Sequence, residues 1–156
     1  LHNALRDMDT MRKNEGKELA ADLHKRIKLI EESLIIVENR AAKRVPEERE
    51  RLRARIGQLF ESDEIDEQRL QMEIVLLADK LDISEEKVRL TQHLKYYLEV
   101  MQNETFNGKK LGFISQEIGR EINTLGSKAN HHEIQKLVVM MKDDLEKIKE
   151  QTLNVL

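Results

Sequence analysis

The chain has 156 residues, of which 37% are charged, with a formal net charge of −3 at pH 7 and no cysteine or tryptophan. Without cysteine, the chain has no disulfide framework, no thiolate nucleophile and no Cys-ligated zinc, which suits a reducing, cytoplasmic setting. The balanced charge excludes a uniformly basic nucleic-acid binder, and no apolar run approaches the roughly 18 residues that would span a membrane.

Few glycines and one proline among many Ala, Leu, Glu, Lys and Arg residues predict an all-α fold of five or six helices. The first apolar stripe recurs at steps of three and four residues and comprises Leu19, Leu23, Ile27, Ile30, Leu34, Val37 and Ala41. It predicts a long helix from near Leu5 to near Arg44, in a helical hairpin or a coiled-coil-like arm. Pro46 then suits the first turn of a new helix, followed by Glu47 and Glu48.

The acidic stretch from Glu61 to Glu67 suits a loop or a helix start. Between Gln68 and Leu81, apolar residues lie on most sides of the expected helix, which predicts that this helix is buried. Ser84 suits the N-cap of the next helix. That helix is expected to direct a further set of side chains to the core, namely Val88, Leu94, Tyr97, Leu98 and Met101.

Two more stripes follow Gly108. One comprises Leu111, Ile114, Ile118, Ile122 and Leu125, and the last comprises Ile134, Leu137, Val138, Met141, Leu145 and Ile148. Tyr97 and Phe113 also suit the core. The pattern predicts a long helical arm or hairpin over residues 1–60 and a C-terminal helical domain of catalytic type over residues 61–156.

The polar face around the Ser84 helix is rich in groups that do chemistry, namely Asp82, Glu85, Glu86, Arg89 and His93. Spacings of three and four residues put Arg89 and His93 on a common side with Glu85 or Glu86. Such a face could hold a divalent ion on carboxylate and imidazole ligands beside a phosphate bound by arginine. Helix capping with exposed ion pairs is the alternative, and spacing alone favours it.

A second polar face lies opposite the Leu111 to Leu125 stripe and comprises Gln116, Glu117, Arg120, Glu121, Thr124 and Lys128, flanked by Asn123 and Ser127. Glu117 and Glu121 lie one turn apart, as two carboxylates on a shared metal would. Arg120 and Lys128 could meet phosphates. A solvated face with Glu–Arg pairs is again the alternative that the pattern alone favours.

Four segments of the chain resemble the YicC-type endoribonucleases. The run from Gly108 to Lys128 resembles the family signature, and the run from Arg69 to His93 resembles its other C-terminal block. The tail from Met141 to Asn154 and the weaker segment from Met11 to Leu19 also resemble the family. The similarity therefore covers nearly the whole chain, although Gly112 and Gly119 replace larger residues that are usual there. Gly119 inside a helix indicates a close approach of a neighbouring helix.

The resemblance implies a bacterial, cytoplasmic endoribonuclease, a hydrolase that depends on a divalent metal ion, Mn²⁺ or Mg²⁺. It implies a homo-oligomer, a hexamer, that encloses single-stranded or structured RNA between protomers, without membrane contact. No preference for DNA is inferred. The family's N-terminal α/β portion is absent, so the chain resembles the C-terminal portion of a longer protein.

Chemistry suggests roles for the residues that match the family motifs. The metal-ligand candidates are Asp82, Glu86, His93, Glu117 and Glu121, and the catalytic candidates among them are His93, Glu117 and Glu121. The RNA-binding candidates are Arg89, Arg120, Asn123 and Lys128. Outside the family motifs, Arg51 and Arg55 are a second contact region, and a solvated basic helix paired with Glu47, Glu48 and Glu50 is the alternative there. His93 could instead take the proton of a 2′-hydroxyl. Water attack would leave a 5′-phosphate, whereas 2′-hydroxyl attack would leave a 2′,3′-cyclic phosphate.

This hypothesis makes one geometric demand. The Ser84 helix and the Leu111 helix must lie side by side, with Glu117 or Glu121 within metal-bridging reach of His93 or Asp82, in one protomer or across an interface. The alternative function is a non-enzymatic helical scaffold that mediates oligomerisation or binds RNA, which the balanced charge and the long first stripe also suit.

Overall fold

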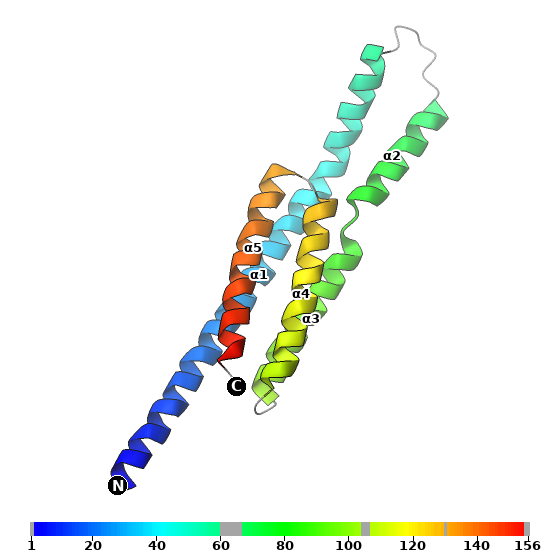
Figure 1. Cartoon of the computed structure of the whole chain (residues 1–156). Helices are drawn as coiled ribbons and strands as arrows, with labels where there is room; N and C mark the ends of the chain where they lie inside the picture. The colour runs from blue at the N-terminus through cyan, green and yellow to red at the C-terminus, as the bar shows by residue number, and fades with distance from the viewer. Residues whose placement is uncertain (1, 60–66, 104–106, 130, 155–156) are drawn as a thin grey trace.

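The computed structural model describes residues 2–59, 67–103, 107–129 and 131–154. Across these residues the fold is all-α, as predicted, and the helices are α1 (His2–Leu59), α2 (Glu67–Leu81), α3 (Ser84–Asn103), α4 (Gly108–Lys128) and α5 (His132–Leu153). The helices α3 and α5 pack against the middle of α1, α4 packs on both α3 and α5, and α2 lies beside the C-terminal part of α1 (Figure 1). Most of the acidic stretch, residues 61–66, lies outside the described residues.

The first helix does not end near Arg44, as the sequence predicted, but continues through Pro46 to Leu59. An internal proline removes one amide donor, so the carbonyl of Ala42 loses its helical partner. Both Pro46 and Ala42 are exposed, which lets water donate to that carbonyl. Strong helix formers on both sides of Pro46 then favour one continuous helix over two.

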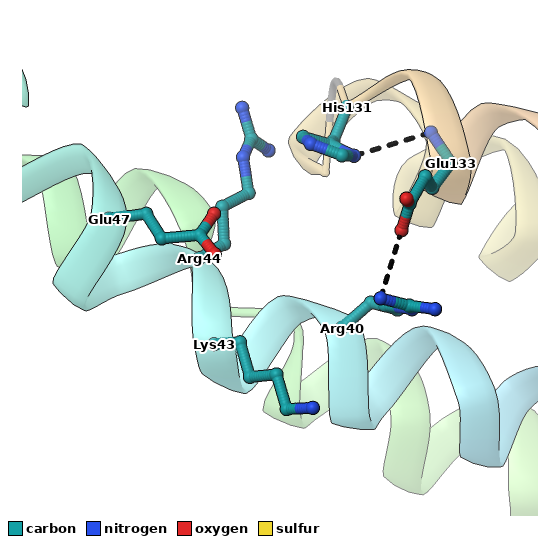
Figure 2. Close-up of a pocket in the computed structure, with 6 residues that line it drawn as sticks. All are labelled: Arg40, Lys43, Arg44, Glu47, His131 and Glu133. Atoms are coloured by element: carbon teal, nitrogen blue, oxygen red, sulfur yellow. Dashed lines mark hydrogen bonds and ion pairs between the residues drawn. The ribbon is translucent and has the colours of Figure 1, made fainter.

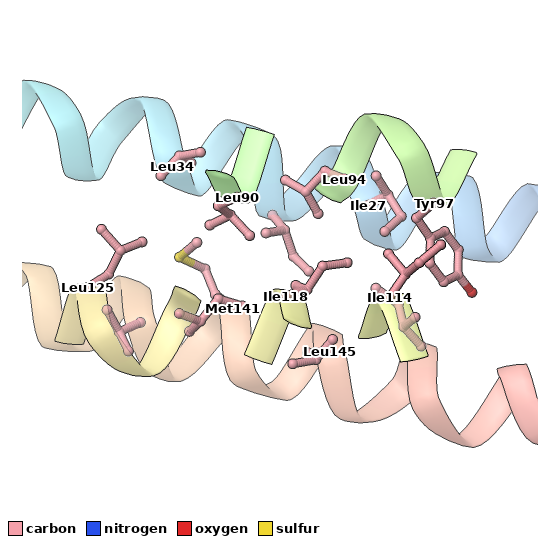
Figure 3. Packing of buried hydrophobic residues seen from close by; sticks show 14 of the residues in the cluster. Ile27, Leu34, Leu90, Leu94, Tyr97, Ile114, Ile118, Leu125, Met141 and Leu145 are labelled. Carbon is pink, nitrogen blue, oxygen red and sulfur yellow. The ribbon is translucent and has the colours of Figure 1, made fainter. Parts of the chain in front are cut away.

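The core is built from the middle of α1 together with α3, α4 and α5 (Figure 3). All five stripe residues of α1 from Leu23 to Val37 are buried, and so are the five predicted on α4. On α5, Leu137 is half-buried against the core and the other stripe residues are buried. The Tyr97 hydroxyl, also buried, lies 2.9 Å from Oγ1 of Thr152. These three predicted stripes are therefore confirmed.

Some of the core predictions are wrong. Phe113 is 64% exposed and Val88 is 53% exposed, while Leu90 takes the buried position on α3. On α2 Leu70 is buried, but a large apolar group on that helix is exposed, namely Met72, Val75 and Leu76. The reason is that α2 lies outside the bundle and packs mainly on α1, so one of its sides is covered (Figure 1).

The N-terminal part of α1 extends beyond the bundle, and its side chains from His2 to Glu18 are exposed. The middle of α1 shares one core with α3, α4 and α5. A division at residues 60 and 61 stays a prediction, and it would separate segments that share this core. None of the helices in the described ranges is long and apolar enough to cross a bilayer.

The helices α4 and α5 approach closely at Gly119, as the sequence indicated. A Cβ atom at Gly119 would lie 3.1 Å from Cδ2 of Leu145 on α5. By contrast, a Cβ atom at Gly112, two turns earlier on α4, would meet nothing within 4 Å. The two glycines therefore have different structural roles on one helix.

Candidate functional site

The polar faces of α3 and α4 meet at Arg89. Its Nε lies 2.9 Å from Oε1 of Glu121 on α4, and its Nη1 lies 3.3 Å from Oε2 of Glu85 on α3. Its Nη2 lies 3.6 Å from Oε1 of Glu86. The hydrogen bond to Glu121, followed by the nearby negative charges, raises the pKa of Arg89 despite partial desolvation. The guanidinium therefore holds the two helices together through carboxylates on both.

Lys128 joins the end of α4 to the start of α3. Its Nζ lies 2.7 Å from Oε1 of Glu86 and donates to the backbone carbonyl of Asp82 at 3.3 Å. The hydrogen bond to Glu86 raises the pKa of Lys128, so the ammonium stays charged at neutral pH. We name the set Glu85, Glu86, Arg89, Glu121 and Lys128 the α3–α4 charged cluster.

The two carboxylates at the centre of this cluster are buried. Glu86 is 2% exposed and Glu121 is 5% exposed. Each uses Oε1 for its cation, while Oε2 of each is buried and has no hydrogen-bond partner among the described residues. A buried carboxylate is costly unless it is paired and hydrogen-bonded. Each therefore keeps one oxygen that accepts no hydrogen bond from the described residues.

Asp82 acts mainly on the start of α3. Its Oδ1 accepts from the backbone N–H of Ser84 at 2.9 Å and also from the Ser84 hydroxyl. These hydrogen bonds, with the side-chain one largest, hold the pKa of Asp82 below its ordinary value. Ser84 was predicted as the N-cap, but it is the first helical residue and Asp82 supplies the capping oxygen. Asp82 contacts the cluster through its backbone carbonyl.

The other predicted site residues lie along the same two helices. Glu117 pairs with Arg120 at 3.7 Å, and the Arg120 side chain is 73% exposed. Asn123 is exposed, and its backbone carbonyl accepts from the Ser127 hydroxyl. His93 is half-buried on α3, one turn after Arg89. These residues lie on the same faces of α3 and α4 as the charged cluster. The ion pair of Glu117 with Arg120 and the hydrogen bond from Ser127 to Asn123 stay within α4 and do not reach the cluster.

The described part of the chain brings together no group of three His, Asp or Glu side chains that could hold a metal ion. The demand that α3 and α4 lie side by side is met, and their polar faces converge. The polar contacts between the two faces are made by Arg89 and Lys128, however. The five predicted metal ligands do not come together as one group around a shared point. Within one chain, the described residues thus do not form a metal centre with three or more protein ligands.

A groove opens beside the charged cluster. Its volume is about 510 Å³, and it lies between α1 and the connection from α2 to α3, with Asp82 and Ser84 in its wall. Lys87 on α3 pairs with Glu38 on α1 in the same wall. The groove gives solvent and ligands access to the start of α3.

Arg51 and Arg55 lie on the part of α1 beyond Pro46, and both are exposed. Arg51 pairs with Glu48 at 3.4 Å. Glu38 lines the groove beside the charged cluster. At a rise of about 1.5 Å per residue, Arg51 lies roughly 20 Å further along α1 than Glu38. The second contact region is thus separate from the α3–α4 charged cluster.

Two features of this end of the bundle were not predicted from the sequence. One is the burial of Glu86 and Glu121, because helix spacing shows which residues share a face but not how deeply that face is covered. The other is a pocket that includes Arg40, Arg44 and His131. Part of that pocket could have been predicted, because Arg40 and Arg44 are four residues apart and so share a face of the first helix.

The chain matches known proteins over most of its length. The family model "Endoribonuclease YicC-like, C-terminal" matches residues 37–156. The chain is 38% identical, over 99% of its length, to "Probable endoribonuclease YicC" of Clostridioides difficile (strain 630), and covers 53% of that protein. It is 32% identical, over 97% of its length, to the protein of the same name in Haemophilus influenzae, and covers 52% of it. The chain thus spans about half the length of these curated relatives.

Proposed function

Because this chain belongs to the YicC-like endoribonuclease family through its C-terminal domain, we propose that it forms the C-terminal part of an enzyme that cleaves phosphodiester bonds in RNA. The observation that carries the proposal is the α3–α4 charged cluster. It combines two persistent cations with two buried carboxylates at the junction of the two helices that carry the family-like motifs.

The cluster contains the groups that phosphodiester cleavage needs. A scissile phosphate gains negative charge in the transition state, and Arg89 and Lys128 offer fixed positive charge to stabilise it. In this proposal Glu121 is the base that would take a proton from the attacking hydroxyl, because its Oε2 accepts no hydrogen bond from the described residues. That hydroxyl is either a water or the 2′-hydroxyl of RNA.

Glu86 and His93 have supporting roles in this proposal. Glu86 binds Lys128 and lies within 3.6 Å of Arg89, so it keeps both cations at the junction. His93 follows Arg89 by one turn on α3 and remains the candidate for protonating the leaving oxygen or for acting as the base. The product ends distinguish these routes, since 2′-hydroxyl attack yields a 2′,3′-cyclic phosphate.

The requirement for Mn²⁺ or Mg²⁺ stays a prediction from the family resemblance. The described residues of one chain bring together no three metal ligands, so we derive no step through a metal. Cleavage assays in EDTA, Mn²⁺ and Mg²⁺ test the prediction directly. Loss of cleavage in EDTA and its return with Mn²⁺ would support metal dependence, and equal rates in all three would contradict it.

We also propose that the protein acts in the cytoplasm as a homo-oligomer, a hexamer in the family-based prediction. The exposed apolar residues of α2 support an association surface, because a contiguous exposed apolar face on a helix commonly marks an interface. Sedimentation analysis of the protein, with Val75→Glu and Leu76→Glu as disrupting substitutions on α2, tests this part of the proposal.

The central experiment is incubation of the full-length protein that contains this chain with defined RNA oligonucleotides. We expect internal cleavage that Arg89→Met and Glu121→Gln abolish, while Arg12→Met on the projecting part of α1 leaves it intact. RNA binding without cleavage by the unaltered protein would contradict the enzyme and favour the alternative, a non-enzymatic RNA-binding scaffold. The product ends from the same reaction identify the attacking group.

A further inference from the structure

A second polar pocket lies on the face of α1 opposite the groove beside Asp82. Its volume is about 140 Å³, and its walls are the middle of α1 and the start of α5. Figure 2 shows the side chains that line it, namely Arg40, Lys43, Arg44, Glu47, His131 and Glu133. The groove and the pocket use different residues of α1. The groove is lined by Glu38, Ala41, Ala42 and Val45, and the pocket by residues that lie between and beyond them, as expected for two opposite faces of one helix.

The pocket has an excess of positive charge. Three of its residues are cations, whereas Glu47 and Glu133 are its two carboxylates. One cation, Arg40, is paired with Glu133 at 3.2 Å. In Figure 2 the guanidinium of Arg44 lies on the same side of α1 as the ring of His131. The geometry therefore favours an anion over a cation or an apolar ligand.

The start of α5 adds to this positive potential. His131 is the N-cap of α5, and its Nδ1 accepts from the backbone N–H of Glu133 at 3.2 Å. With Nδ1 as an acceptor, the neutral ring carries its hydrogen on Nε2, which is then a donor. The N-terminal end of a 22-residue helix also carries partial positive charge.

The pocket is continuous in sequence with a basic stripe on α1. Arg40, Arg44, Arg51 and Arg55 follow one another at steps of four, seven and four residues, which places all four on one face of the helix. Two of them line the pocket, and the other two lie further along α1, beyond Pro46. Such a stripe offers successive contacts to a polyanion, and the pocket lies at the Arg40 end of it.

We propose that this pocket binds one phosphate group of an RNA strand whose further phosphates follow the stripe along α1. The inference rests on the proposed function, because that function supplies the RNA. A volume of about 140 Å³ accommodates one phosphate group with a few waters, but not a nucleoside. The phosphate is either the terminal one of the strand or one within it. It would replace Glu133 as the partner of Arg40.

The test is RNA binding in EDTA by the full-length protein, measured by fluorescence anisotropy across a range of salt concentrations. The main variant is Lys43→Ala, because Lys43 is exposed and its replacement leaves the core intact. We expect about threefold to tenfold weaker binding and a salt slope smaller by about 0.7, the value for one lost single-strand phosphate contact. The matched control is Lys25→Ala, an exposed lysine of the same helix roughly 27 Å away.

A second arm identifies which phosphate is bound. The same RNA sequence is compared with a 5′-phosphate and with a 5′-hydroxyl end. If the phosphate is terminal, Lys43→Ala weakens binding of the phosphorylated strand alone, whereas for an internal phosphate it weakens both strands equally. Arg44→Gln provides a further variant. Thermal unfolding of each variant separates a binding defect from misfolding, because Arg44 is half-buried.

The outcomes separate this inference from the proposed function. Weaker binding by Lys43→Ala but not by Lys25→Ala supports the pocket, even if the protein binds RNA without cleaving it. Equal binding by the two variants overturns the pocket, whether or not RNA is cleaved. Failure of the unaltered protein to bind RNA also overturns it. Titration with inorganic phosphate, followed through the His131 ring signals by NMR, gives a readout independent of RNA, and no change in those signals would count against the site.

Discussion

Nε of Arg89 on α3 and Oε1 of Glu121 on α4 lie 2.9 Å apart, and this ion pair joins residues separated by 32 positions in sequence. Glu121 is almost fully buried, while the Arg89 side chain is 44% exposed. The pair thus holds a carboxylate at the base of a site that a cation covers from the solvent side. An anion that binds Arg89 from solvent therefore meets a guanidinium that is already paired with this carboxylate.

The first prediction concerns the charge of Glu121. Glu121→Gln preserves the shape of the side chain and a hydrogen-bond acceptor for Arg89, but it removes the base. We expect RNA cleavage to fall by about 100-fold or more, the usual contribution of a general base. Single-turnover cleavage rates provide the measurement. Glu146→Gln, on the exposed face of α5, is the matched control, and an equal effect of the two substitutions would refute the role of Glu121.

The second prediction uses the two glycines of α4. Gly112→Ala should raise the free energy of unfolding by about 0.5–1 kcal/mol, because alanine favours the helix and its Cβ meets nothing within 4 Å. Gly119→Ala gains the same helix preference but forces Leu145, a buried residue, to move. We therefore expect Gly119→Ala to be less stable than Gly112→Ala. Urea unfolding of both variants decides this, and equal stabilisation would show that α5 accommodates the methyl group.

The third prediction concerns Asp82 as the cap of α3. Asp82→Ala should lower the free energy of unfolding at pH 7 by about 0.5–1 kcal/mol, because the N–H of Ser84 loses its acceptor. The folded pKa of Asp82 lies below the ordinary value of 3.8, so its stabilisation is present above that pH and is lost as pH falls through the folded pKa. The difference between the variant and the parent should therefore shrink in acid. A difference that is constant from pH 7 to pH 2 would exclude the charged cap.

The fourth prediction concerns the buried Tyr97 hydroxyl. Tyr97→Phe should cost about 1 kcal/mol, because the hydrogen bond to Thr152 is lost while Thr152 still donates to the carbonyl of Ile148. Tyr96→Phe is the matched control, since Tyr96 is 42% exposed on the same helix. Urea unfolding at pH 7 measures both changes.

The same tyrosine predicts a change at alkaline pH. Burial raises the pKa of Tyr97 above 10.0, which means that the unfolded chain releases this proton first as pH rises. The stabilisation is full below pH 10 and decreases above it. Tyr97→Phe should remove that part of the alkaline loss of stability, and Tyr96→Phe should not.

The sequence predicted the fold well where periodicity alone decides the outcome. The stripes of α1, α4 and α5 gave the correct buried positions because each of these helices covers one side against a common core. The same reasoning failed for α2, since the number of apolar residues does not say how many helices will surround them. It also failed at Pro46, where exposure and flanking helix formers outweigh one lost hydrogen bond.

The site was predictable only in part. Helix spacing placed Arg89 and Glu121 on faces that do converge, but spacing within a helix cannot give contacts between two helices. The ion pair from Arg89 to Glu121 and that from Lys128 to Glu86 span α3 and α4, so they depend on the crossing of the two helices. The roles of His93 and Glu117 stay predictions, and cleavage assays on His93→Ala and Glu117→Gln would test them.

The continuity of α1 through Pro46 has a geometric consequence. A helix of 58 residues is about 87 Å long, and its middle is clamped by the bundle while both tips are unsupported by α3, α4 and α5. Ile30, near the midpoint of this length, is fully buried in the core, so the bundle fixes α1 at its centre. The two ends each extend about 40 Å to either side, so α1 offers surfaces to other molecules that are on the order of 80 Å apart.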